Sequence, residues 1–275
     1  MTGHLGDADA VLVVDETGDL KKGTRTVAVQ RQNTGTAGRI ENAQVSVYLT
    51  YATGAGHAQI DRALYLPASW AGDHERRAAA GVPDDVAFAT KPELARQMIA
   101  RALDGGAAAP WVTGDEVYGA DPGLRRELEE RTTGYVLAVA CSHQVTTAVL
   151  VRVAGRRWTV EETFQAAEGL AGLDQHQVRR WNSWHRWTTL AMLASAFLAV
   201  LAATERTRQP PPDGMIPLTS SEIHHLLNVL PAQPGCSIRH RLRWSAWRRS
   251  HQHRARISRY QKRADHENHE VRLPY

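Results

Sequence analysis

Cysteines and long apolar runs are scarce in this 275-residue sequence. Its two cysteines, Cys141 and Cys236, are far apart and lack metal-site spacing, which argues against a disulfide framework and for a reducing cytoplasm. The N-terminus has neither the basic nor the apolar region of a signal peptide. The one long apolar run, from Leu190 to Ala203, is short for a bilayer span and predicts a buried core helix. These absences disfavour a secreted disulfide scaffold and a membrane protein.

Acidic residues are absent from one part of the chain. Between Cys236 and Arg263 there are nine arginines and one lysine but no aspartate or glutamate, although the net charge of the whole chain is only +4. Such an uneven charge distribution is typical of a protein that binds a polyanion, and the alternative is a solvated basic tail. We expect a basic helix between Arg239 and Arg263.

Hydrophobic and glycine patterns predict the order of the secondary-structure elements. Strands are expected at residues 11–14, 25–30 and 44–53, where β-branched residues recur, and glycine turns would join them into an antiparallel meander. Four further elements follow along the chain: a helix at 91–104, a strand at 111–113, a helix at 122–131 and a strand at 134–140. From Trp158 onward the pattern is helical. This order is that of the ribonuclease H-like fold, an α/β (α+β) fold with a mixed sheet flanked by helices.

Composition also suggests where the chain divides. We expect a core at residues 1–206, followed at 207–275 by a proline-rich linker and a basic helical C-terminal region. Within the core, the glycines and prolines of residues 67–83 predict an irregular surface segment. In the C-terminal region, Ser221 is the expected N-cap of a short amphipathic helix.

Acidic residues follow two of the predicted strands. Asp15 ends VLVV and Asp115 follows WVTG, while Glu161 and Glu162 are expected to open a helix. Carboxylates in these positions can converge on hard cations such as Mg²⁺, and two ions can stabilise the attacking and leaving oxygens of a phosphoryl transfer. Taken singly, each acid has a simpler interpretation, as a turn former, a helix cap or a complement to a helix dipole.

Several long stretches of the sequence resemble bacterial insertion-sequence transposases with a DDE endonuclease domain. The resemblance covers nearly the whole chain and is carried by these motifs: DETGDLKKG (15–23), QRQNTGTAGRIENAQVSVYL (30–49), DRALYLPASW (61–70), FATKPELA (88–95), WVTGDEVYGADPGLR (111–125), RRWTVEETFQAAEGLAGLDQHQVRRW (156–181) and IPLTSSEIHHLL. It implies a ribonuclease H-like core that binds two divalent metal ions, Mg²⁺ or Mn²⁺.

The resemblance also implies roles for single residues. Asp15 and Asp115 match the first and second catalytic, metal-binding acids of the family. The third acid belongs to an R-x3-E-x6-K pattern whose first half is matched by Arg157 and Glu161, so we favour Glu161 over its neighbour Glu162. The implied reaction is cleavage at the transposon ends, followed by attack of the freed 3′-hydroxyl on target DNA.

Partners and location follow from the same resemblance. DNA is the expected partner, with no membrane or small-molecule substrate, and a homodimer would form in a synaptic complex. A cytoplasmic protein that associates with the nucleoid when bound to DNA is expected. The basic residues predicted to contact DNA are Lys21, Lys22, Arg39, Arg157, Arg248 and Arg249.

The sequence departs from the family in three places. Glu168 stands where the family has a lysine that contacts DNA, the chain begins almost at the first strand, and residues 141–157 are interpreted as the joined ends of a shortened insertion. We therefore interpret the chain as an N-terminally truncated member that lacks the internal insertion. The departures favour an alternative function, a catalytically impaired DNA-binding remnant. An ordinary ribonuclease H-like nuclease is a third hypothesis.

Tryptophans at a three-residue spacing occur in the predicted long helix. Trp181, Trp184 and Trp187 lie among arginines and histidines, a pattern that also occurs where aromatic rings stack on unpaired bases. Their helical spacing favours a stripe that faces the core instead.

Overall fold

The computed structural model describes residues 5–35, 37–138, 147–229 and 238–270. It divides into two compact units, Met1–Phe197 and Leu198–Tyr275. Residues 141–146 of the predicted insertion remnant and both cysteines lie outside the described residues.

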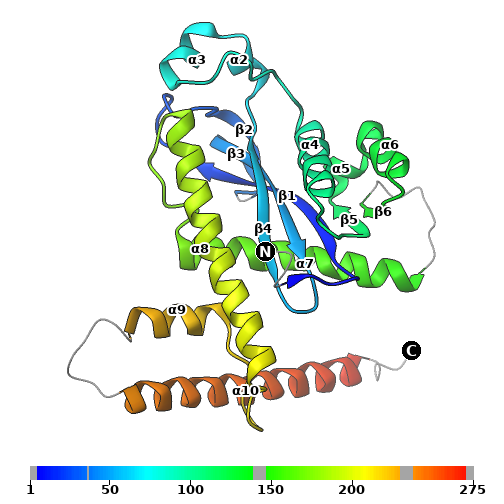
Figure 1. Cartoon of the computed structure of the whole chain (residues 1–275), viewed down its shortest axis with the longest axis vertical. Helices are drawn as coiled ribbons and strands as arrows, with labels where there is room; N and C mark the ends of the chain where they lie inside the picture. The colour runs from blue at the N-terminus through cyan, green and yellow to red at the C-terminus, as the bar shows by residue number, and fades with distance from the viewer. Residues whose placement is uncertain (1–4, 36, 139–146, 230–237, 271–275) are drawn as a thin grey trace. The chain divides into compact units, whose positions relative to one another are not determined.

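A mixed sheet forms the centre of the first unit (Figure 1). In the described residues it has six strands in the order β2-β3-β1-β5-β6, with β4 also paired to β3. β1 is antiparallel to β3 and parallel to β5, and β5 is parallel to β6. The strands are β1 (Val11–Leu20), β2 (Gln30–Thr34), β3 (Arg39–Ala52), β4 (His57–Leu64), β5 (Trp111–Gly114) and β6 (Gly134–Leu137). Antiparallel and parallel strands flanked by helices confirm the predicted fold class.

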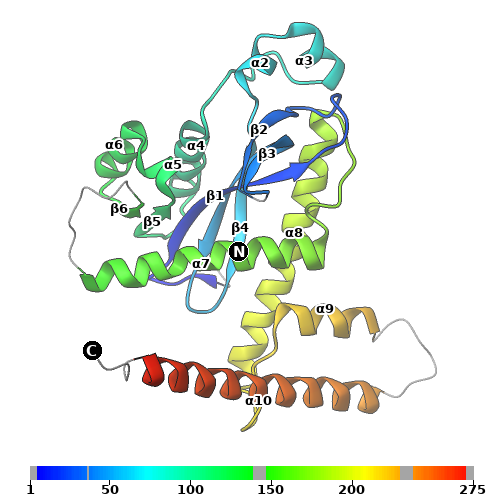
Figure 2. The same cartoon turned by 180° about the vertical axis from the view of Figure 1, so that it is seen from behind.

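Helices connect and cover these strands. Those of the first unit are α2 (Ala68–Ala71), α3 (His74–Ala80), α4 (Lys91–Asp104), α5 (Glu116–Gly119), α6 (Pro122–Glu130), α7 (Thr147–Ala171) and most of α8 (Trp181–Arg208). α4 has its predicted bounds because the Thr90 side chain accepts the N–H of Glu93 and Pro92 lies in the first turn. α7 runs across one face of the sheet and is seen in front of it in Figure 2.

Alternation along β1 decides which of its side chains face α7. Val11 and Val13 are fully buried in a cluster with Val160 and Phe164 of α7. Successive side chains of a strand point to opposite faces, so the odd-numbered positions of β1 share this face. The next odd position is Asp15, which therefore faces α7 where the apolar cluster gives way to polar residues.

One strand prediction was wrong and one strand was missed. The strand expected at residues 25–30 begins only at Gln30, because the Gln44 and Trp70 side chains bind the backbone carbonyls of Val27 and Val29. These carbonyls therefore have hydrogen-bond donors without pairing to a neighbouring strand. Strand β4 was not predicted, since its sequence HAQIDRAL has little of the β-branched alternation that signals a strand.

Three helix predictions also need correction. α7 begins at Thr147 and not near Trp158, so the two glutamates at 161 and 162 lie inside a helix and do not open it. The segment at 67–83 holds α2 and α3, the second of which is capped by Asp73. The N–H of Glu222 is accepted by Thr219 and not by Ser221, which lies inside α9.

The apolar helix α8 has a buried and an exposed side. Trp184 is fully buried and Trp181 packs on the same cluster, as the helical spacing predicted, while Trp187 is 37% exposed. Leu190 and Phe197 are more than half exposed whereas Ala191 and Ala196 are buried, so the expected core helix is buried on one side only. By length and composition α8 is the one helix of the described chain that could cross a membrane, a weak indication because buried helices pass the same test.

The second unit contains the predicted basic helix, which is confirmed. It consists of the end of α8, α9 (Ser220–Val229) and α10 (Ile238–Glu270). The guanidinium of Arg248 on α10 pairs with the carboxylate of Glu222 on α9, whose side chain is only 8% exposed. Arg249 donates to the backbone carbonyl of Ile216 at 2.8 Å. These contacts fix α10 to α9 and to the segment before it.

Candidate active site

Strand register brings the two predicted aspartates together. β1 and β5 are paired from Val11 with Trp111 to Val13 with Thr113. Continuing this register by two residues sets Asp15 beside Asp115. In neighbouring parallel strands, side chains at the same register point to the same face, so both carboxylates face α7.

The chain turns away from the sheet directly after this register. Asp115 is the N-cap of α5 and accepts the N–H of Val117 at 2.9 Å. Gly114 lets β5 approach β1 closely, because a Cβ there would lie 2.8 Å from a methyl group of Val14. The side chain of Asp115 therefore serves as a helix cap and as the neighbour of Asp15.

Both aspartates have a raised pKa. Burial raises the pKa of Asp15 from 3.8 to about 6, with repulsion from Asp115 and Glu16 adding to it. Burial also raises the pKa of Asp115, and the charge of Glu16 adds to that shift. Carboxylates with raised pKa values carry negative charge that the surrounding protein does not fully compensate. Such a pair suits a cation or a proton.

Glu16 is a nearby acid that we did not select from the sequence. Its carboxylate lies 2.6 Å from the ammonium of Lys91 and accepts the hydroxyl proton of Tyr118. Burial, followed by the charge of Glu16, raises the pKa of Tyr118 well above its ordinary value. Glutamate after both strand-end aspartates was the only sequence signal for this cluster, and nothing indicated its partners.

α7 presents a basic side chain to the aspartate pair and carries the predicted third acid one turn later. Arg157 is exposed, and its charge lowers the pKa of both Asp15 and Asp115, though less than burial raises them. Glu161 follows one helical turn later on the same side and is also exposed. One turn further, Phe164 packs edge-on against Tyr48, the cross-strand partner of Asp15, with ring centroids 5.4 Å apart.

The neighbouring glutamate points elsewhere. The carboxylate of Glu162 lies 3.5 Å from Nε2 of His57 on β4. The other ring nitrogen of His57 lies 2.6 Å from the hydroxyl of Thr163. Glu161 is therefore the glutamate on the Arg157 side of α7, whereas Glu162 belongs to the contact with β4.

Metal coordination by these residues depends on a third ligand. No group of three or more His, Cys, Asp or Glu side chains within the described residues is arranged to hold a metal ion. Asp15 and Asp115 nevertheless fit a hard divalent cation, since they are carboxylates on one face with raised pKa values. The structure brings these two residues together and leaves Glu161 exposed to solvent.

The other predicted DNA contacts differ in accessibility. Lys22 is exposed. The ammonium of Lys21 is buried, donates to the carbonyl of His176 at 3.1 Å, and has its pKa lowered by burial. Arg39 is 75% exposed but pairs with Glu41 at 2.8 Å. In the second unit, the guanidinium groups of Arg248 and Arg249 contact their own chain.

Glu168 belongs to an acidic cavity beyond the aspartate pair. This cavity of about 280 Å³ is lined by Asp19, Glu168 and Asp174 together with neighbouring residues of β1. Burial raises the pKa of Glu168, and Asp174 and Asp19 add to the shift. The ring of His176 lies 2.9 Å from the Asp19 carboxylate. The family's lysine position therefore lies among carboxylates in this chain.

Comparison with known proteins relates the chain to a family and to a curated relative. A family model described as DDE superfamily endonuclease matches residues 1–186. Over 137 residues the chain is 31% identical to the "Probable transposase for insertion sequence element IS701" of Microchaete diplosiphon. That match covers 49% of this chain and 33% of the relative, so the chain spans about a third of the relative's length.

Proposed function

Because the chain belongs to the DDE superfamily endonuclease family, we propose that it is a transposase catalytic domain that cleaves and transfers DNA strands of an insertion sequence. This proposal is supported by the register of β1 and β5, which, continued past Val13 and Thr113, sets Asp15 beside Asp115, and by the raised pKa of Asp15. Two adjacent, partly buried carboxylates with raised pKa values have no evident structural purpose beyond the cap that Asp115 provides.

Each residue of the site would have a separate role. Asp15, Asp115 and Glu161 would hold divalent cations, Mg²⁺ or Mn²⁺, with two ions expected. These ions would stabilise the negative charge that develops on the phosphate. The guanidinium of Arg157 would bind a phosphate oxygen beside the carboxylates and orient the scissile bond. Lys91 would hold Glu16 away from the phosphate through their ion pair.

DNA is the partner that this family implies, and the transposon ends and target would be its specific forms. A homodimer in a synaptic complex belongs to the same proposal. Family membership suggests a soluble cytoplasmic protein, and association with the nucleoid would accompany DNA binding.

Two observations favour a second candidate, a DNA-binding remnant with impaired catalysis. Glu161 is exposed and belongs to no group of three ligands in the described part of the chain. Glu168 adds negative charge in an acidic cavity where the family has a cation, and this would repel a phosphate.

Nicking of supercoiled plasmid DNA with Mn²⁺, with Mg²⁺ and with EDTA tests the first candidate. The variant Asp115→Asn is preferable to alanine, because asparagine still caps α5 and removes only the charge. Asp85→Asn, at an exposed aspartate of the same unit, is the matched control. We expect metal-dependent nicking by the wild type and the control and none by Asp115→Asn.

The outcomes separate the two candidates. Nicking that survives Asp115→Asn would show that another site or a contaminant cleaves the DNA. Absence of nicking by the wild type, with DNA binding that weakens as salt is raised, would support the remnant. Absence of both nicking and binding would refute both candidates.

A further inference from the structure

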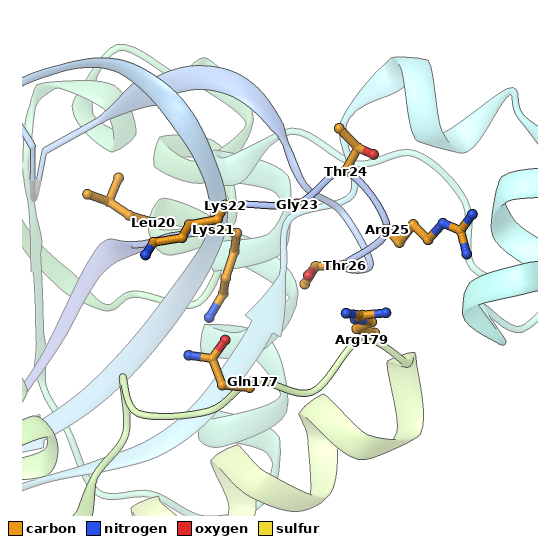
Figure 3. Close-up of a pocket in the computed structure, with 9 residues that line it drawn as sticks. All are labelled: Leu20, Lys21, Lys22, Gly23, Thr24, Arg25, Thr26, Gln177 and Arg179. Atoms are coloured by element: carbon orange, nitrogen blue, oxygen red, sulfur yellow. The ribbon is translucent and has the colours of Figure 1, made fainter.

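Basic side chains gather around two adjoining cavities in the first unit, away from the aspartate pair. The larger cavity, of about 680 Å³, is lined by Lys21, Lys22, Arg25 and Arg179 among other residues (Figure 3). The second, of about 470 Å³, shares Arg25 and Arg179 and adds Arg76 and Arg180. No aspartate or glutamate of the described chain lines either cavity. We call these two cavities together the basic pocket.

The loop that carries Arg25 is held from three directions. The N–H of Val27 donates to the carbonyl of Arg179 at 2.9 Å. Two side chains, Gln44 and Trp70, donate to carbonyls of the same loop at 2.8 Å each. The buried Ala28 adopts a φ of 62°, a left-handed conformation that costs a non-glycine residue energy. These contacts fix the backbone of the basic pocket in one conformation.

Of the basic side chains that line the pocket, Lys21 alone pairs with a carboxylate in the described residues, with its ammonium 3.9 Å from Asp19. In the described part of the chain, Lys22, Arg25 and Arg179 form no salt bridge, and all three are exposed. Arg76 donates to backbone carbonyls, among them that of Val29 at 3.0 Å, and stacks at 3.9 Å over the ring of Trp70. These positive charges thus lie together on a fixed frame, which favours an anionic ligand.

We propose that the basic pocket binds the phosphodiester backbone of DNA at a point separate from the catalytic carboxylates. This inference rests on the proposed function, since it assumes that DNA is the partner. Adjoining cavities with shared arginines suit successive phosphates of a polymer better than one small anion. Arginine guanidiniums, with their planar arrays of donors, match phosphate oxygens.

The position of the basic pocket sets its distance from the active site. Asp15 and Leu20 are five residues apart on β1, which corresponds to about 17 Å at the usual strand rise. On duplex DNA this distance equals about five base pairs. Asp19 lies between them in the acidic cavity, so the phosphates would not follow a continuous track along β1. The basic pocket is therefore a second anchor that fixes the register of the duplex.

Salt dependence of DNA affinity tests this inference. The full chain would be titrated with a fluorescent 30-base-pair duplex at several salt concentrations, as wild type and as the double variant Arg25→Gln/Arg179→Gln. Loss of two phosphate contacts predicts a log–log salt slope shallower by about two and at least about tenfold weaker binding at 0.1 M salt. The control Arg126→Gln changes an exposed arginine of α6 that lines neither cavity. Its slope should equal that of the wild type.

Three additional measurements separate the loss of charge from unfolding and from the binding of a small anion. Arg25→Lys/Arg179→Lys should keep most of the slope, since charge is retained, and circular dichroism melts should show all variants folded. If the wild type binds DNA and the glutamine variant has the same salt slope as the wild type, the inference is overturned and the proposed function stays intact. If pyrophosphate binding is lost in that variant while the DNA slope is unchanged, the pocket holds a free anion instead. Failure of the wild type to bind DNA would overturn both.

Discussion

Replacing Asp15 by asparagine should stabilise this protein. Its pKa is raised from 3.8 to about 6 mainly by burial, so the folded state binds a proton that the unfolded state has released. Stability therefore falls as pH rises through this interval, and the cost is complete above about pH 6. Because the pKa differs by about two units between the folded and unfolded states, ionisation of Asp15 lowers the free energy of unfolding by about 3 kcal/mol at pH 7.5. At pH 4.5, where the folded state is still largely protonated at Asp15, the destabilisation is only about 1 kcal/mol.

Asparagine removes this cost and keeps the local structure. Its side-chain oxygen can still accept the N–H of Glu16, which lies 2.8 Å from the Asp15 carboxylate. We therefore expect Asp15→Asn to raise the free energy of unfolding by about 1–3 kcal/mol at pH 7.5 and by clearly less at pH 4.5. Asp85→Asn, at an exposed site, should change little at either pH.

Urea unfolding in EDTA at the two pH values measures the difference directly. A parallel series with Mg²⁺ tests the same carboxylate as a ligand, since a cation that binds only the folded state stabilises it. The wild type should gain stability with Mg²⁺, and Asp15→Asn should gain less. The reasoning would be refuted if Asp15→Asn were less stable than the wild type at pH 7.5. It would also be refuted if the substitution changed the free energy of unfolding by the same amount at both pH values.

Three further substitutions have outcomes that the structure fixes. Gly119→Ala places a Cβ against the backbone carbonyl of Ala138 and should lower the free energy of unfolding by about 1–3 kcal/mol in urea titrations. Glu168→Lys removes a negative charge from the acidic cavity and adds a positive one, so it should tighten duplex DNA binding several-fold in a fluorescence titration, and Glu168→Gln should do so less. Arg248→Ala leaves the buried carboxylate of Glu222 without its partner, and faster tryptic cleavage within α10 should result.

The sequence predicted elements best where the local signal agrees with the tertiary contacts. α4 has a capping threonine, a first-turn proline and a terminal glycine, and it forms where these signals indicate. The segment at 25–29 has β-branched alternation, yet it forms a loop because Gln44, Trp70 and Arg179 bind its backbone. Local pattern cannot reveal such partners, since they come from distant parts of the chain.

The candidate site shows the same limit. From the sequence we expected the strand-end acids Asp15 and Asp115 to converge with Glu161 on a cation, and the register of β1 and β5, continued by two residues, sets the two aspartates side by side. The ion pair between Glu16 and Lys91 joins residues 75 positions apart, which no spacing rule predicts. Sequence alone also failed to separate Lys21, whose ammonium is buried, from the exposed Lys22.

The position of Glu161 depends on the start of α7. A helix that began near residue 158 would hold the glutamate in its first turn, where fraying and the helix dipole affect a carboxylate. α7 begins at Thr147, so Glu161 lies inside a continuous helix whose Val160 and Phe164 are packed on the sheet. Rotation of the helix to bring Glu161 closer would uncover these side chains. Closure of a three-carboxylate site would therefore have to come from the flexible glutamate side chain and from a cation that draws it toward Asp15, and not from movement of the helix.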